Sequence, residues 1–311
     1  MKTVRDLGAF RLIRRLRRTI GAVDPSVIVG IGDDCAVLSL RDARKYLLLT
    51  CDPVVEGIHF KPTTPPRQVG WKAMARNLSD IAAIGGLPCW AVVSLGLRAG
   101  TSVTTAEQIY QGLRAAARPF GCQIVGGDTT HVRREQFVVV TLVGEVEKSR
   151  LLLRSGAKIG DSVFVTGTLG GSLRGKHLTF TPRIAEAHWL ARHFPIHAMI
   201  DVSDGLSSDL QRLVDASKRR VGFEIHAAEI PIARAARGKL AAALNDGEDF
   251  ELLFTIDPRH VTALRKRWPH NFTLPLTEIG RVVRSHGVKL IGRDGRKTSL
   301  PPKGYDHFAV S

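Results

Sequence analysis

The chain has 311 residues and a formal net charge of +16, because 45 Lys and Arg outnumber 29 Asp and Glu, and its pI is about 10.3. A hydrophobic content of 44% is enough for one large domain or two ordinary ones, which excludes disorder over most of the chain. The longest apolar runs, such as Phe137–Val143, are far shorter than the roughly 20 residues of a membrane-spanning helix. Basic residues from Arg11 to Arg18 stand where a signal peptide would be apolar, so we expect a cytoplasmic protein.

Apolar residues recur at helical intervals between Leu7 and Ile20, with arginines between them, which predicts an amphipathic helix with a basic face. A docked helix with a solvated charged face is the usual explanation, and binding to nucleic acid or to an anionic membrane surface is the alternative. Aromatic residues make up only 6% of the chain and do not interleave with the basic runs. We therefore expect neither nucleic acid nor a membrane as the partner.

The first half of the chain mixes strand and helix patterns. Strands are predicted at Tyr46–Cys51, Trp90–Leu97, Cys122–Val125 and Phe137–Glu145, the third delivering Gly126, Gly127 and Asp128 at its end. Helices are predicted at Arg67–Ile84 and from a capping box at Thr104–Glu107 to Phe120. The four cysteines, Cys35, Cys51, Cys89 and Cys122, form no C-x-x-C pair and are predicted to be reduced thiols.

Periodicity breaks over Glu147–Asp161, which predicts a connection between domains at residues 1–148 and 149–311. Strands and helices then alternate, which is typical of an α/β half. The predicted strands are Val163–Thr166, Ala198–Val202, Gly222–Ile225, Phe250–Ile256 and Glu278–Val283. The predicted helices are Pro182–Arg192, Gly205–Lys218, Ala233–Leu244 and Pro258–Trp268.

Aspartates gather in Gly-rich or apolar surroundings at expected element ends. A single one of these is commonly an N-cap or turn residue, but five such clusters favour a ligand set. Carboxylates suit Mg²⁺, which bridges them to substrate phosphates, and phosphoryl transfer needs little beyond such charge neutralisation and positioning. The candidate ligands are Asp34, Asp52, Asp80, Asp128, Asp201 and Asp204.

Other nucleotide and hydrolase motifs are incomplete. Residues Gly170–Lys176 fit a P-loop, but His177 replaces the hydroxyl residue that such a loop offers to Mg²⁺. Gly30 and Gly32 lack the third glycine of a dinucleotide fingerprint. No G-x-S-x-G elbow is present, which argues against a serine hydrolase.

In their order, nine motifs of the chain resemble those of the thiamine-monophosphate kinase family. The motifs are GIGDDCAVL (30–38), TCDPVVEGIHF (50–60), NLSDIAAIGGLP (77–88), GGDTT (126–130), RSGAKIGDSVFVTGTLG (154–170), MIDVSDGLSSDL (199–210), GEDFELLFT (247–255), IGRV (279–282) and KGYDHF (303–308). The resemblance implies phosphorylation of thiamine monophosphate to thiamine diphosphate by ATP, with several Mg²⁺ ions. It also implies a two-domain α/β (α+β) fold shared with aminoimidazole ribonucleotide synthetase, selenophosphate synthetase and a hydrogenase maturation protein. In that fold the N-terminal mixed β domain pairs with a second subunit in a barrel, and the C-terminal domain is α/β.

The resemblance also implies residue roles, carried over motif by motif. It implies magnesium ligands at Asp34, Thr50, Cys51, Asp52, Asp80, Asp128, Asp201 and Asp204. It implies nucleotide contacts at Gly127, Asp128, Arg154 and Ser203, and thiamine-phosphate contacts at His59, Glu248 and Tyr305. Asp128 and Asp204 are the expected catalytic residues. A general base is not required, because the acceptor phosphate is already ionised, and direct in-line transfer is expected.

Departures from the family pattern leave alternatives open. Cys51 and Pro53 replace threonines, His131 replaces an arginine, and Gly171–Thr181 differs from the usual segment. One alternative is another ATP-dependent synthetase of the same fold, although no cysteine lies beside a lysine in an N-terminal Gly-rich loop. The other is a basic nucleotide- or nucleic-acid-binding protein that lacks catalysis.

Overall fold

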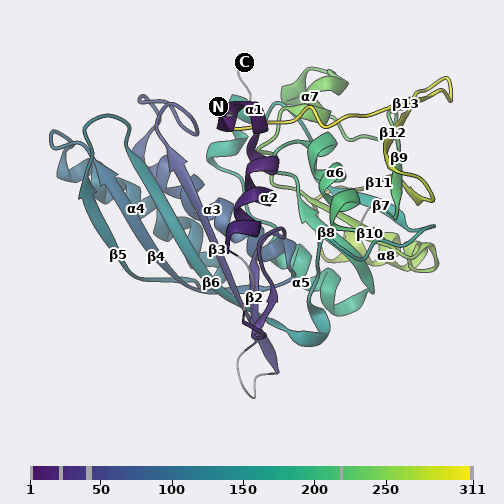
Figure 1. The fold of residues 1–311 in the computed structure, drawn as a ribbon, viewed down its shortest axis with the longest axis horizontal. Helices are drawn as coiled ribbons and strands as arrows, with labels where there is room; N and C mark the ends of the chain where they lie inside the picture. The colour runs from purple at the N-terminus through teal and green to yellow at the C-terminus, as the bar shows by residue number, and fades with distance from the viewer. Residues whose placement is uncertain (1–2, 21–23, 40–43, 218–219, 309–311) are drawn as a thin grey trace.

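The computed structural model describes residues 3–20, 24–39, 44–217 and 220–308, and each half of the chain is built on one sheet (Figure 1). The first sheet is antiparallel except for the parallel pair β4 and β5, and β5 lies at its edge. Its strands, in spatial order, are β1 (Val27–Val29), β2 (Ala36–Ser39), β3 (Lys45–Val55), β6 (Phe137–Glu147), β4 (Leu87–Leu97) and β5 (Gln123–His131).

The second sheet is also largely antiparallel, with β12 and β9 as its parallel pair. Its strands, in spatial order, are β13 (Lys297–Ser299), β12 (Gly287–Ile291), β9 (Gly222–His226), β11 (Leu276–Val283), β7 (Ser162–Thr166), β10 (Leu252–Ile256) and β8 (Ile196–Asp201). The two mixed sheets with their helices confirm the predicted two-domain α+β fold.

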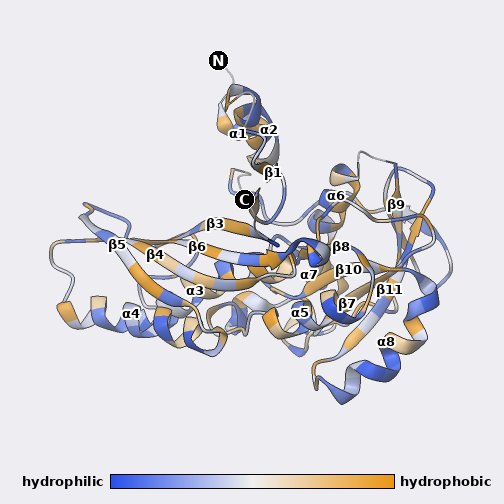
Figure 2. Ribbon diagram, turned by 90° about the horizontal axis from the view of Figure 1, so that it is seen from below, coloured by the Kyte–Doolittle hydropathy of each residue, from blue (hydrophilic) through white to orange (hydrophobic). Residues whose placement is uncertain are grey.

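The helices cover the sheets unevenly. Figure 2 shows α3 and α4 against one face of the first sheet, whereas α1 and α2 stand away from the body on the side of the other face. The predicted N-terminal helix is present as α2, yet its apolar Ile13, Leu16 and Ile20 are exposed. The α-helices are α1 (Val4–Leu7), α2 (Ala9–Ile20), α3 (Pro66–Ala83), α4 (Val103–Ala117), α5 (Ile184–His193), α6 (Leu206–Ala216), α7 (Leu240–Asn245) and α8 (Val261–Arg267).

Helix α3 lies where the two halves meet. It crosses α4 so closely that a Cβ on Gly70 would lie 1.9 Å from the carbonyl oxygen of Ile109. It also contacts α5 and β8 of the second half. Met74 of α3 belongs to the same buried apolar cluster as Phe164 and Met199. This packing fixes α3 between the domains, with its polar face available to a site.

Three local predictions are wrong, each for a local reason. Helix α4 is capped by Ser102, whose hydroxyl accepts from the backbone N–H of Thr105, so the predicted box at Thr104–Glu107 lies inside the helix. Strand β5 does not end before Gly126, Gly127 and Asp128 but runs through them, because they pair with β4. The helix predicted over Ala233–Leu244 is split by Arg237, whose φ is +52°.

Among the described residues, no helix combines the length and apolar character that crossing a membrane requires.

Candidate phosphoryl-transfer site

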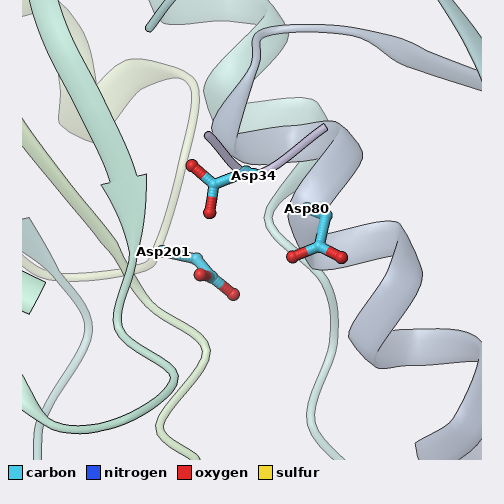
Figure 3. A group of neighbouring side chains, drawn as sticks. All are labelled: Asp34, Asp80 and Asp201. Atoms are coloured by element: carbon cyan, nitrogen blue, oxygen red, sulfur yellow. The ribbon is translucent and has the colours of Figure 1, made fainter. Parts of the chain in front are cut away.

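Three aspartates converge between the two halves (Figure 3). Asp34 follows β1 in a turn, Asp80 lies on α3 and Asp201 ends β8, and one carboxylate oxygen of each lies within 4.8 Å of the others. Hydroxyls orient two of them: Thr50 Oγ1 donates to Asp80 at 2.6 Å, and Ser79 Oγ donates to Asp201 at 2.6 Å. We call these three aspartates the carboxylate triad. Its all-oxygen donor set fits a hard divalent cation such as Mg²⁺.

The triad concentrates negative charge in a buried place. Burial raises the pKa of Asp201 to about 7, and the charge of Asp34 adds to the rise. Burial also raises the pKa of Asp80 well above its usual range, with further contributions from Asp52 and Asp201. Like charges this close favour protonation unless a cation neutralises them. The electrostatics therefore agree with the donor chemistry in suiting a metal ion.

Arg154 partly balances this charge from the segment that joins the halves. Its Nη2 and Nε donate to the two carboxylate oxygens of Asp34 at 2.6 and 3.0 Å. Its backbone N–H donates to Asp33 Oδ2 at 3.2 Å. A residue predicted to contact nucleotide thus lies against the carboxylate triad.

The other predicted metal ligands lie outside the triad. Asp52 accepts from Arg76 Nε at 3.2 Å, and Asp204 is paired with Arg212. Asp128 is exposed on the edge strand β5, with Oδ1 accepting from the backbone N–H of Thr129. Cys51 is exposed on the face of β3 opposite to Thr50, because successive side chains of a strand alternate.

A second cluster of polar residues surrounds the fully buried Lys72 of α3. Its ammonium donates to the carbonyl oxygen of His59 at 2.7 Å and to Glu248 Oε2 at 2.5 Å, and lies 2.8 Å from His177 Nδ1. Glu248 is held by a backbone φ of +54° and by its N–H, which donates to the carbonyl oxygen of Ser203 at 2.7 Å. Two of the predicted thiamine-phosphate contacts, His59 and Glu248, thus share one lysine.

Tyr305 joins this cluster from the C-terminal segment. Its backbone N–H donates to the carbonyl oxygen of Asp204 at 2.9 Å. The ring centroid of His307 lies 4.8 Å from that of Tyr305 and 5.3 Å from that of His59. All three predicted acceptor contacts therefore lie in one region, which the KGYDHF segment borders.

Charge in this second cluster is set by mutual contacts. Burial raises the pKa of Glu248, but hydrogen bonding from His177 and the charges of Lys72 and Arg76 outweigh burial and bring this pKa down to about 2. Burial lowers the pKa of His59 to about 3, and it lowers the pKa of Lys72 to about 8 despite Glu248. At neutral pH Glu248 is therefore an anion and His59 is neutral.

Sequence reasoning missed Lys72, Arg76 and His177. Lys72 and Arg76 precede Asp80 at four-residue intervals on a helix, so these three side chains share one face. This spacing could have indicated that both residues belong to the site. His177 entered only as the residue that spoils the P-loop pattern, and nothing in the sequence indicated its contact with Glu248.

The P-loop-like segment has a structural role, as its missing hydroxyl indicated. The backbone N–H groups of Gly170 and Gly171 donate to carboxylates, those of Asp249 and Asp246, at 2.9 Å each. Lys176 Nζ donates to the buried Glu251 at 2.7 Å. The groups that would bind phosphate in a P-loop are thus occupied by the protein's own carboxylates.

Comparison with known proteins assigns the chain to a family. Residues 32–146 match the family described as AIR synthase related protein, N-terminal domain, and residues 155–293 match AIR synthase related protein, C-terminal domain. The thiamine-monophosphate kinase of Rhodopirellula baltica is 37% identical over 298 residues, covering 91% of this chain and 92% of the relative. That of Aquifex aeolicus is 36% identical over 333 residues, covering 98% and 99%. The chain belongs to the thiamine-monophosphate kinase family.

Solved structures agree with this assignment. A structure described as AaThiL complexed with AMPPCP and TMP matches with a TM-score of 0.84 and 35% identity, covering 99% of both chains. Membership of the thiamine-monophosphate kinase family makes the chain an enzyme, a phosphotransferase. The alternative of a binding protein without catalysis is thereby wrong, and full-length kinase relatives disfavour a synthetase of the same fold.

Proposed function

We propose that the protein transfers the γ-phosphate of ATP to thiamine monophosphate and releases thiamine diphosphate and ADP. The observation that carries the proposal is the carboxylate triad, which lies between the domains and shares helix α3 with the cluster around Lys72. The AaThiL structure, which was solved with AMPPCP and TMP, supports the same pair of substrates.

Mg²⁺ is the proposed cofactor. Asp34, Asp80 and Asp201 would hold it, and several ions are proposed, with Thr50, Cys51, Asp52, Asp128 and Asp204 as the further ligand positions. When bound, Mg²⁺ neutralises charge on the phosphates of ATP. At position 51 the side chain faces away from the triad, so only the backbone carbonyl is proposed as a ligand there.

The protein's own residues would bind and orient the two substrates. Gly127, Asp128, Arg154 and Ser203 are the proposed nucleotide contacts. His59, Glu248 and Tyr305 are the proposed acceptor contacts, with the Glu248 carboxylate facing the positively charged thiazolium ring. Asp128 and Asp204 are the proposed catalytic residues. The acceptor phosphate is ionised at neutral pH, so we propose direct in-line transfer that depends on positioning and charge stabilisation rather than on a general base.

We also propose that the enzyme is a cytoplasmic homodimer. One face of the first sheet exposes the apolar Leu49, Trp90, Val92 and Val125, a surface suited to a second copy.

Residues 1–148 would bind ATP and Mg²⁺ and form the dimer, and residues 149–311 would complete the site. All four cysteines are free thiols, as in a reducing compartment.

The proposal is tested by following ADP release from ATP with Mg²⁺ and one acceptor at a time. We expect turnover with thiamine monophosphate and none with thiamine or with substrates of aminoimidazole ribonucleotide synthesis. We expect EDTA to stop the reaction. ADP release that does not depend on thiamine monophosphate would refute the assignment.

A further inference from the structure

We infer that Arg76 binds the phosphate group of the acceptor and thereby selects a phosphorylated acceptor over the corresponding alcohol. This inference rests on the proposed function and adds to it a specificity residue that lies outside the nine family motifs. It is carried by the position of Arg76, by its unused hydrogen-bond donors and by the geometry of its guanidinium.

Arg76 lies between the two parts of the site. On α3 it is one turn from Lys72 and one turn from Asp80, so its side chain shares their face. Its Nη2 lies 3.2 Å from Oδ2 of Asp52, a proposed metal ligand, and its Nη1 lies 3.7 Å from Oε1 of Glu248, a proposed acceptor contact. In the proposed function the acceptor phosphate would react with ATP beside the proposed metal ligands while its organic part contacts Glu248, which would place the phosphate in this interval.

The guanidinium has donors that the protein does not use. The Arg76 side chain is 13% exposed, and Nη1 is buried without a hydrogen-bond partner among the described residues. The 3.7 Å contact of Nη1 with Glu248 is too long for a hydrogen bond. A buried donor without an acceptor destabilises the folded protein, so its presence in a site favours a missing ligand.

Glu248 makes its close polar contacts with groups other than Arg76. Lys72 donates to its Oε2 at 2.5 Å, and His177 Nδ1 lies 2.9 Å from the same oxygen. With Glu248 satisfied by these neighbours, Nη1 of Arg76 is left for an incoming acceptor. A phosphate monoester dianion matches the planar fork of arginine with two parallel hydrogen bonds, whereas a hydroxyl can accept only one.

The test measures the binding of thiamine monophosphate and of thiamine to the full-length protein by isothermal titration calorimetry with Mg²⁺, and it follows the turnover of thiamine monophosphate by steady-state kinetics. For Arg76→Gln we expect affinity for thiamine monophosphate to fall about 10- to 100-fold, as for loss of a charge-assisted pair, and affinity for thiamine to change less than about threefold. Arg76→Lys, which keeps the charge without the fork, should give an intermediate loss. Arg265→Gln, which removes an exposed arginine paired with Glu278, is the matched control and should leave both affinities unchanged.

Equal losses for the two acceptors would mean that Arg76 only supports Asp52 and Glu248, and would overturn the inference. Unchanged affinity for thiamine monophosphate would overturn it as well. If Arg76→Gln does not fold by circular dichroism, Arg76→Lys decides, because an unaltered ratio of the two affinities in it excludes phosphate recognition by the fork. Wild-type protein that neither binds nor phosphorylates thiamine monophosphate would instead refute the proposed function, and with it this inference.

Discussion

The three carboxylates of the triad repel one another in the absence of a cation. Asp201 is nearly fully buried, and the Asp34 side chain is 1% exposed, so water cannot screen their repulsion. Arg154 forms hydrogen bonds with Asp34, and its charge only partly offsets the rise in the pKa of Asp201. A fold keeps such an arrangement when a ligand supplies the missing positive charge, which is why we propose that the triad binds Mg²⁺.

Asp80→Asn tests this assignment. The variant should unfold at the same or a higher temperature than wild type without metal, because one of three repelling charges is gone. It should lose the rise in unfolding temperature that Mg²⁺ gives wild type, and turnover should fall at least about 100-fold, as for loss of one electrostatic group. Thermal unfolding with and without Mg²⁺ measures the first two effects. Asp294→Asn, on an exposed loop, is the control, and a full Mg²⁺ response in Asp80→Asn would contradict the assignment.

Asp249, which lies outside the carboxylate triad, gives a prediction about pH dependence. Burial raises the pKa of this carboxyl to about 7, against the N–H of Gly170 and the charge of Lys176, which lower it. The pKa of Asp249 is higher in the folded than in the unfolded protein. The stabilisation that protonated Asp249 gives the fold is therefore present below about pH 4 and is lost as pH rises through 7. The free energy of unfolding of Asp249→Asn relative to wild type should therefore increase by roughly 2–4 kcal/mol from pH 4 to pH 8. Urea denaturation at both pH values measures this difference, and a constant difference would show that Asp249 stays ionised throughout.

At the scale of elements, helix α3 organises the site. The apolar spacing and the glycines after it predict the helix over Arg67–Ile84, and the observed helix is Pro66–Ala83. The same pattern predicts that Asp80 belongs to a site. It does not predict the neighbours of Asp80, because Asp34 and Asp201 come from distant segments and are brought together only when α3 packs against both halves.

The crossing of α3 and α4 is therefore a sensitive point. A Cβ on Gly112 would lie 1.9 Å from the carbonyl oxygen of Arg67, so Gly112→Ala must push the helices apart. We expect a loss of at least about 1–3 kcal/mol in the free energy of unfolding, with reduced turnover because α3 carries Asp80. Gly100→Ala is the control, since a Cβ there meets nothing within 4 Å. Equal stability of the two variants in chemical denaturation would contradict the tight crossing.

At the scale of the whole molecule, the order of motifs was sufficient to predict the family and the two-domain fold, and both are confirmed. The motifs did not predict which way individual side chains point. The contact of His177 with Glu248 joins segments that no motif connects. The exposure of Cys51 depends on how its strand pairs in the sheet. A charge of +16 would suit a polyanionic partner, but the proposed site presents carboxylates, which would meet phosphates through a metal ion. We therefore propose only a steering role toward ATP for the excess charge.

The exposed sheet face leads to a prediction about assembly. We expect light scattering after gel filtration to give about twice the 34.0 kDa of the chain. Val92→Asp places a charge in the apolar face and should give a monomer, whereas Val103→Asp, at an exposed helix start, should not. A monomeric wild-type protein would contradict the homodimer. A Val92→Asp dimer of unchanged stability would show that the dimer uses another surface.

The identity of the product tests the central claim most directly. Purified protein is incubated with ATP, Mg²⁺ and thiamine monophosphate, and the products are separated by anion-exchange chromatography. We predict thiamine diphosphate and ADP in equal amounts, with no phosphorylated product when thiamine replaces the monophosphate. ATP consumption without thiamine diphosphate, or phosphorylation of thiamine itself, would contradict the account.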